Sequence, residues 1–198
     1  EIELALVKLY RVTGEKRYLD LALFFINNRG CNDKDVCIAD EPTYGQDDVP
    51  PREMKSAVGH AVRCLYLLCG MADCADAADD SELMQACERV FDDIANYKMY
   101  VTGAVGSTNI GEAFTIKYDL PNEKAYAETC ASIALMMFAN RMAKYRKAAK
   151  YADAAERRCI TECYRECHCR VMLSFMKTRL KLIWRIKKRC RCSKKKTI

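Results

Sequence analysis

The sequence lacks any long apolar run, and no segment approaches the roughly eighteen consecutive apolar residues that a membrane-spanning helix requires. It also lacks an early basic stretch followed by an apolar run and a small-residue cleavage site, which is the pattern of a secretory signal. We therefore expect a protein that neither spans a membrane nor shows a signal for export. Because the chain starts at Glu1 rather than Met, inside a helical pattern, we also expect a fragment that is missing at least its start.

A C-x-x-C pair is absent too, although the 198 residues include 13 cysteines. Cysteine-rich disulfide scaffolds are typical of small extracellular proteins, whereas this chain is long enough to bury a core of its own. The cysteines up to residue 158 lie in or between helical patterns. We therefore interpret the thiols as reduced and the location as cytoplasmic.

The net charge of +6 combines two unlike regions. Residues 1–156 carry 18 Lys and Arg against 25 Asp and Glu, a net charge of −7, whereas residues 157–198 carry 15 against 2, a net charge of +13. Such a break marks a domain edge, a nucleic-acid-binding tail or a sequence from another reading frame. We divide the chain into a domain over residues 1–158 and a basic, cysteine-rich tail over residues 159–198.

Apolar periodicity predicts an all-α domain built of helical hairpins. A first helix ends at Thr13-Gly14, and further helices are predicted over residues 16–26, 52–72, 82–97, 125–145 and 148–158, with Ser81 as the N-cap of the helix that starts at residue 82. A long loop is expected over residues 31–51, and a loop or small hairpin over residues 98–110.

An internal repeat supports this organisation. The similar segments 18–22, 83–87 and 151–155 each begin the second helix of a pair, at spacings of 65 and 68 residues. The period is too long for a tetratricopeptide array, which needs about 34 residues per repeat. Helix pairs that bury one face against the next pair suit a solenoid or a closed ring.

Residues 111–132 concentrate the groups that are able to do chemistry. Glu112 lies in a short loop, where it is either a general acid/base or a solvated carboxylate. Glu128 and Cys130 lie where an apolar helix begins, and a carboxylate and a thiolate are both zinc ligands. Their spacing is a weak signal for a metal site. An acidic residue near a helix N-terminus and a small buried cysteine would give the same pattern without binding a metal. His60, on an apolar face, is either a ligand contact or a hydrogen-bonded core residue.

Several motifs occur in one order: Tyr44-Gly-Gln-Asp47, Ser56-Ala-Val-Gly-His-Ala-Val-Arg63, Lys98-Met-Tyr-Val-Thr-Gly103, Gly111-Glu-Ala-Phe-Thr115 and Tyr126-Ala-Glu-Thr-Cys-Ala-Ser-Ile133. Together they closely resemble the catalytic core of glycoside hydrolase family 127, the β-L-arabinofuranosidases, from about residue 1 to about residue 158. The resemblance implies an (α/α)6 barrel, of which this chain would supply a partial toroid.

The resemblance also implies roles for individual residues. Glu112 matches the general acid/base of a retaining double displacement. Glu128 and Cys130 match two ligands of a zinc ion whose set is one glutamate and three cysteines, one of which is the nucleophile. The other two cysteines belong to a later part of the family domain, so the nucleophile is not identified in this chain. His60, Gln46 and Asp47 are expected to bind an arabinose-containing oligosaccharide.

Two positions depart from the family pattern, because Asp48 and Asn109 stand where histidine is common. Each change removes a possible donor or ligand near the expected site, so weakened sugar contacts are expected. The missing nucleophile and the half-built ring lead us to expect an inactive fragment.

The tail allows other interpretations. Cys159, Cys163 and the run 167–169 could bind zinc, and the basic run 185–196 could bind phosphates or an acidic membrane surface. The family pattern stops abruptly after Arg157, however, which favours a shifted reading frame and no specific partner in nucleic acid or membrane. Two alternative functions remain: a helical-repeat binding module whose tail binds nucleic acid or lipid, and a metal-free enzyme that uses Glu112 with Asp47.

Overall fold

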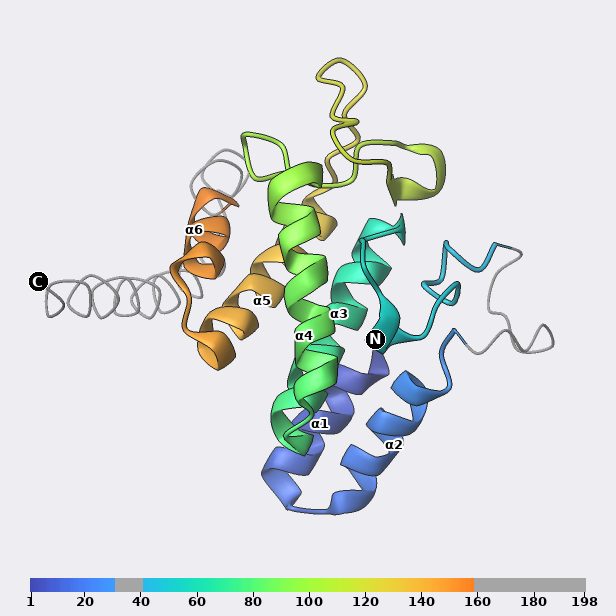
Figure 1. Ribbon diagram of the computed structural model, residues 1–198, viewed down its shortest axis with the longest axis vertical. Helices are drawn as coiled ribbons and strands as arrows, with labels where there is room; N and C mark the ends of the chain where they lie inside the picture. Colours follow the sequence, from blue (N-terminus) through green and yellow to red (C-terminus); the bar gives the residue numbers. More distant parts are fainter. Residues whose placement is uncertain (31–40, 159–198) are drawn as a thin grey trace, which may run out of the picture.

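The computed structural model describes residues 1–30 and 41–158 (Figure 1). The predictions for the tail, including its cysteines and basic run, and the first part of the 31–51 loop lie outside the described residues.

Most of the described secondary structure is helical, as the periodicity predicts. The α-helices are α1 (Ile2–Thr13), α2 (Lys16–Asn27), α3 (Ala61–Ala78), α4 (Ser81–Asp93), α5 (Thr129–Arg146) and α6 (Ala149–Arg158). Short 3-10 turns η1 (Pro51–Glu53) and η3 (Ile110–Glu112), a π-helical turn η2 (Ile94–Lys98) and two-residue strands β1 (Gly59–His60) and β2 (Ala113–Phe114) complete it.

The helices form three consecutive hairpins. Helix α1 packs on α2, α3 on α4 and α5 on α6, and α3 also packs against both α1 and α5. The first helices of the three pairs therefore form a row, with α3 in the middle. The chain between η2 and α5 forms loops beyond one end of the helices, at the top of Figure 1.

Local signals explain where the first hairpin turns. Gly14 adopts φ 75°, a left-handed conformation that glycine tolerates, and its N–H donates to the carbonyl of Tyr10 (2.8 Å) to end α1. Val7, Leu19 and Ile26 are buried between the helices and the neighbouring α3. The predicted hairpin is confirmed.

The internal repeat corresponds to repeated packing. The last residue of each repeat segment, Ala22, Cys87 and Ala155, is completely or almost completely buried in α2, α4 and α6. The third segment begins at Tyr151, whose ring packs edge-on against Phe91 of α4 at 4.6 Å between centroids. The second helix of each pair thus buries the same face.

Some helix boundaries differ from the prediction. Helix α3 begins at Ala61 rather than residue 52, because side chains of α4 and η2 bind Ala57 and hold the preceding segment in a non-helical conformation. The N-cap of α4 is Asp80, whose carboxylate accepts from the N–H of Leu83 (2.9 Å), and Ser81 is the first helical residue. Helix α5 begins at Thr129 rather than residue 125.

A buried polar network joins α1, α3 and α5 toward their C-terminal ends. Asp73 of α3 accepts hydrogen bonds from Arg141 Nε (2.8 Å) and from the hydroxyl of Tyr145, both on α5. Arg11 of α1 donates to the same Tyr145 hydroxyl (3.0 Å). Because its partners come from all three helices, this network fixes the row at the end remote from the N-termini of α3 and α5.

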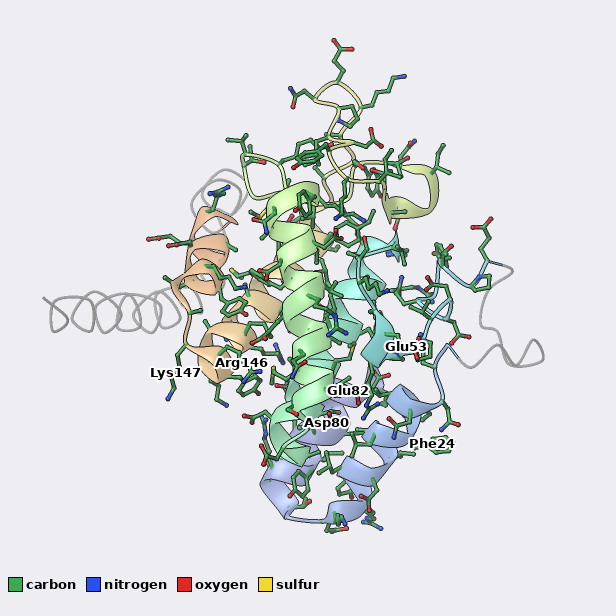
Figure 2. The ribbon with its side chains drawn as sticks, in the orientation of Figure 1. Phe24, Glu53, Asp80, Glu82, Arg146 and Lys147 are labelled. Atoms are coloured by element: carbon green, nitrogen blue, oxygen red, sulfur yellow. The ribbon has the colours of Figure 1, made fainter. Side chains whose placement is uncertain are left out.

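The first hairpin also carries exposed large apolar side chains. Val12 is 86% exposed, and Phe24 points away from α2 toward solvent (Figure 2). None of the helices that the structure describes combines the length and the apolarity that crossing a membrane would demand.

Candidate active site

A two-stranded ribbon at the start of α3 brings distant parts of the chain together. Strand β1 pairs antiparallel with β2, with Gly59 opposite Phe114 and His60 opposite Ala113. Gly59 has φ 64°, and a Cβ there would lie 1.8 Å from the carbonyl oxygen of Thr43, so only glycine fits. The pairing brings His60, at the start of α3, beside the loop that carries Glu112.

Both carboxylate oxygens of Glu112 are held. His60 Nε2 lies 2.9 Å from Oε2, and the hydroxyl of Tyr126 donates to Oε1 (2.8 Å). The Glu112 side chain is 42% exposed, whereas that of His60 is 12% exposed. The carboxylate is therefore fixed in orientation and still open to a ligand.

The histidine tautomer follows from the same geometry. His60 Nδ1 is buried and has no hydrogen-bond partner among the described residues. A proton on Nδ1 would be a buried unpaired donor, which is costly, whereas a proton on Nε2 can be donated to Glu112. The ring of Tyr44 packs edge-on against the His60 ring, with 5.4 Å between centroids.

Tyr126 is a site contact that our sequence reasoning did not assign. Its loop is fixed by a hydrogen bond from Ala127 N to the carbonyl of Gly106 (2.8 Å), and Ala127 adopts φ 47°. The hydrogen bond with Glu112 raises the pKa of the Tyr126 hydroxyl above its usual value, and partial burial and the nearby carboxylates act in the same direction. The hydroxyl is thus kept protonated as a donor. The only signal in the sequence was a tyrosine within the Y-A-E-T-C motif.

Glu128 and Cys130 lie at the N-terminal end of α5, as predicted. Glu128 occupies the N-cap position but makes no side-chain capping bond, and its Oε2 is buried with no hydrogen-bond partner among the described residues. Cys130 is a free, exposed thiol. A side-chain hydrogen bond with Glu128 raises the pKa of Cys130, and repulsion from Glu112 contributes in the same direction.

Tyr126 and Cys130 lie close enough to both glutamates to interact with them. Tyr126 and Cys130 each interact with both Glu112 and Glu128. The structure thus brings together Glu112, His60, Tyr126, Glu128 and Cys130 at the N-terminal ends of α3 and α5.

Glu128 and Cys130 offer groups of the kind that bind zinc. A carboxylate and a thiol side by side, with one carboxylate oxygen buried and unpaired, fit two positions of a four-ligand site. Within residues 1–30 and 41–158, no group of three or more potential ligand side chains is gathered. The zinc assignment of Glu128 and Cys130 therefore stays a prediction.

Gln46 and Asp47 support the backbone near the candidate site. Gln46 is buried, and its Nε2 donates to the carbonyls of Tyr44 (3.0 Å) and Val58 (3.1 Å). Asp47 Oδ1 accepts from the N–H of Gly30 (2.6 Å). These contacts join the loop after α2 to the segment before β1, and the sugar contacts expected of both residues stay predictions.

The two departures from the family pattern lie near the same loops. Asn109 is exposed, and its carbonyl accepts from the N–H of Glu112 (3.4 Å). Asp48 is partly buried. Asn109 thus contributes a backbone contact that a histidine could also make.

Comparison with known proteins identifies relatives of this chain. The family described as the β-L-arabinofuranosidase, GH127 catalytic domain, matches residues 1–162. A non-reducing end β-L-arabinofuranosidase of Bifidobacterium longum subsp. longum is 44% identical over 172 residues, which cover 79% of this chain and 26% of that protein.

Solved structures give the same result. The crystal structure of a GH127 β-L-arabinofuranosidase from Geobacillus stearothermophilus T6 superposes with a TM-score of 0.76 at 45% identity, covering 81% of this chain and 27% of that one. A second GH127 β-arabinofuranosidase gives a TM-score of 0.75 at 43% identity, covering 80% and 24%. The chain spans about a quarter of the length of these relatives.

Proposed function

The chain belongs to the β-L-arabinofuranosidase catalytic domains of glycoside hydrolase family 127, and from this premise we propose that it carries the acid/base part of a zinc-dependent retaining active site. The substrate class is an arabinose-containing oligosaccharide from which β-L-arabinofuranose is released. The helical hairpins are part of an (α/α)6 toroid, and residues 159–198 are outside it, as the product of a shifted reading frame.

The contacts of Glu112 support the acid/base role most directly. In a retaining double displacement, one carboxyl group first gives a proton to the departing oxygen and then takes a proton from the attacking water. His60 and Tyr126 donate hydrogen bonds to the two carboxylate oxygens of Glu112 and limit the rotation of its side chain. The oxygen lone pair that exchanges the proton therefore keeps one direction. His60 contacts the sugar from beside this carboxylate, with Gln46 and Asp47 as further sugar contacts.

Glu128 and Cys130 would hold the zinc ion. Zinc, when bound, would keep cysteine sulfur ionised at neutral pH and so supply a sulfur nucleophile. Without zinc, the hydrogen bond with Glu128 raises the pKa of Cys130 and keeps this thiol protonated, which is unfavourable for a nucleophile. The chain by itself is inactive, because residues 1–30 and 41–158 do not gather the remaining ligands and apolar side chains such as Val12 and Phe24 are left uncovered.

Metal analysis tests the ligand assignment. After equilibrium dialysis against zinc, the Cys130→Ala and Glu128→Gln chains are expected to bind less zinc than the unchanged chain. Cys87→Ala, which removes a buried thiol of α4, serves as the control and is expected to bind as much as the unchanged chain. Equal zinc content in Cys130→Ala and the unchanged chain would contradict the assignment.

Activity requires the rest of the domain, so its test uses a graft. The graft is the Geobacillus relative with its matching segment replaced by residues 1–158 of this chain, which is feasible at 45% identity. We expect the graft to release arabinose and the isolated chain to release none. Release by the isolated chain that is abolished by Glu112→Gln would refute the proposed inactivity.

A further inference from the structure

A buried ion pair lies beneath the segment that leads to His60. Asp93, the last residue of α4, is 4% exposed, and Lys98, the last residue of η2, is 5% exposed. Lys98 Nζ lies 3.4 Å from Asp93 Oδ2. Removing two charges from water is costly, so such a pair is weak evidence for stability and calls for another explanation.

The π-helical turn creates this pair. Asp93 and Lys98 are five residues apart, and in an α-helix residues three and four apart are the ones that share a face. In η2 the winding is that of a π-helix, whose hydrogen bonds join residues i and i+5. The wider turn therefore brings the two charges to the same side of the chain.

The pair forms hydrogen bonds with one short segment, Ser56 and Ala57. Asp93 Oδ2 accepts hydrogen bonds from Ala57 N (3.0 Å) and Ser56 Oγ (2.7 Å), and Lys98 Nζ donates to Ala57 O (2.6 Å) and Ser56 Oγ (2.8 Å). Both backbone polar groups of Ala57 are therefore bonded to the pair. These bonds also explain why residues 56–58 are non-helical instead of starting α3.

From Ala57, the chain continues directly into the active-site ribbon. Val58 O accepts from Gln46, Gly59 pairs with Phe114, and His60 follows with its Nε2 against Glu112. The segment has no helix of its own to hold it, so its path depends on these contacts. A shift at Ala57 would move His60 relative to the carboxylate.

We propose that Asp93 and Lys98 are positioning residues that set the place of His60 against Glu112 through Ser56 and Ala57. The relevance of this geometry to catalysis rests on the proposed function, but the geometry itself can be measured without any activity. Neither residue of the pair touches Glu112 or the groups assigned to zinc in the contacts described above.

The test compares three variants of the full chain. Ser56→Ala removes the hydroxyl that bridges the pair, and Lys98→Met removes the ammonium group. Arg141→Met is the matched control, because it breaks the buried contact with Asp73 at the other end of the helix row. The chain has two histidines, so the His60 ring signal in NMR can be assigned with a His60→Asn variant.

The expected result is local. In Ser56→Ala and Lys98→Met, the His60 ring signal moves, and the amides of residues 57–60 exchange about tenfold faster after correction for global stability, a factor equal to about 1.4 kcal/mol. In Arg141→Met, neither quantity changes. Ser56→Ala is the milder variant, because it keeps the ion pair. An unchanged His60 signal in Ser56→Ala would therefore overturn the proposal, even if Lys98→Met fails to fold.

An equal shift of the His60 signal in Arg141→Met would overturn it as well, because the effect would then be one of general stability. Because neither measurement uses arabinose release or zinc, the outcome is separate from that of the proposed function. A catalytically silent graft with a shifted His60 signal in Lys98→Met would retain the positioning role and reject the glycosidase assignment.

Discussion

At the scale of single residues, each carboxylate oxygen of Glu112 accepts from one donor. The hydroxyl of Tyr126 donates to Oε1, and its pKa is raised by that bond, so it stays a donor at and above neutral pH. On Oε2, the partner is the Nε2 proton of His60, because a proton on the buried Nδ1 would be an unpaired donor. The two donors together hold the carboxylate in one orientation.

Replacing Tyr126 by Phe in the graft should lower activity without unfolding the protein. A hydrogen bond to a charged group contributes about 1.5–3 kcal/mol, so we expect kcat/KM for arabinose release to fall by about 10- to 100-fold. Steady-state kinetics measures this. Tyr118→Phe, on an exposed loop tyrosine, is the control and should leave kcat/KM unchanged; equal losses in both variants would reject the role of Tyr126.

These residues differ in how far the sequence alone could identify them. Glu112 and Glu128 are sixteen positions apart, a spacing that carries no geometric signal, and only the resemblance to a family linked them. The contact of Tyr126 depends on the left-handed conformation of Ala127 and on its bond to Gly106. Neither feature follows from local propensity, because alanine rarely adopts positive φ.

At the scale of elements, the ribbon of β1 and β2 depends on one glycine. Gly59→Ala combines positive φ with a collision against the carbonyl of Thr43, whereas Gly45→Ala meets no atom within 4 Å. We expect Gly59→Ala to lower the free energy of unfolding by at least about 2 kcal/mol and Gly45→Ala to change it by less than about 1 kcal/mol. Urea denaturation of both variants distinguishes them. Comparable losses would show that the ribbon tolerates a side chain at Gly59.

The turn between α3 and α4 depends on Asp80, which lies with Glu82 at the start of α4 (Figure 2). Its carboxylate caps α4 through Leu83 N and accepts from Arg52 Nη2 (2.6 Å), and Nη1 of the same arginine donates to Asn27 of α2. Asp80→Ala should therefore lower the unfolding free energy at pH 7 by about 1–2 kcal/mol. Glu82→Ala, at a side chain that is 72% exposed, should change it by less than about 0.5 kcal/mol.

The effect of Asp80 should depend on pH. Partial burial raises the pKa of Asp80, but the hydrogen bonds from Leu83 and Arg52 outweigh it, so the pKa is lowered overall. A group with a lowered folded pKa stabilises the fold above its unfolded pKa of about 3.9 and loses that contribution as pH falls through the folded value. The difference between Asp80→Ala and the unchanged chain should thus shrink in urea denaturation experiments as the pH is lowered below about 3.9; a constant difference would contradict the cap.

Element boundaries were predicted well where local signals dominate. Gly14 ended α1 as expected, since its left-handed conformation is a property of one residue. The predicted start of α3 was wrong because tertiary bonds from Asp93 and Lys98 hold residues 56–57 in a non-helical conformation within a helix-compatible sequence. The N-cap was misplaced by one residue because Asp80 and Ser81 are both favourable caps, and Asp80 additionally binds Arg52.

At the scale of the whole molecule, three similar hairpins form a row, and the N-terminal ends of α3 and α5 carry the candidate site. The repeat at 65- and 68-residue spacing predicted this arrangement, because equivalent positions such as Ala22, Cys87 and Ala155 must be buried in every pair. The polar network around Asp73 fixes the far end of the row. Helix packing thus positions the N-terminal ends of α3 and α5, and the loops at these ends carry the polar groups.

The most direct test of the central claim is arabinose release by the graft carrying Glu112→Gln, measured beside the graft carrying Glu123→Gln at an exposed loop carboxylate. A general acid/base contributes about 10²–10⁴-fold to rate, so Glu112→Gln should reduce kcat by at least about 100-fold, and Glu123→Gln should leave it unchanged. A Glu112→Gln graft as active as the Glu123→Gln graft would contradict the claim that Glu112 is the acid/base of this site.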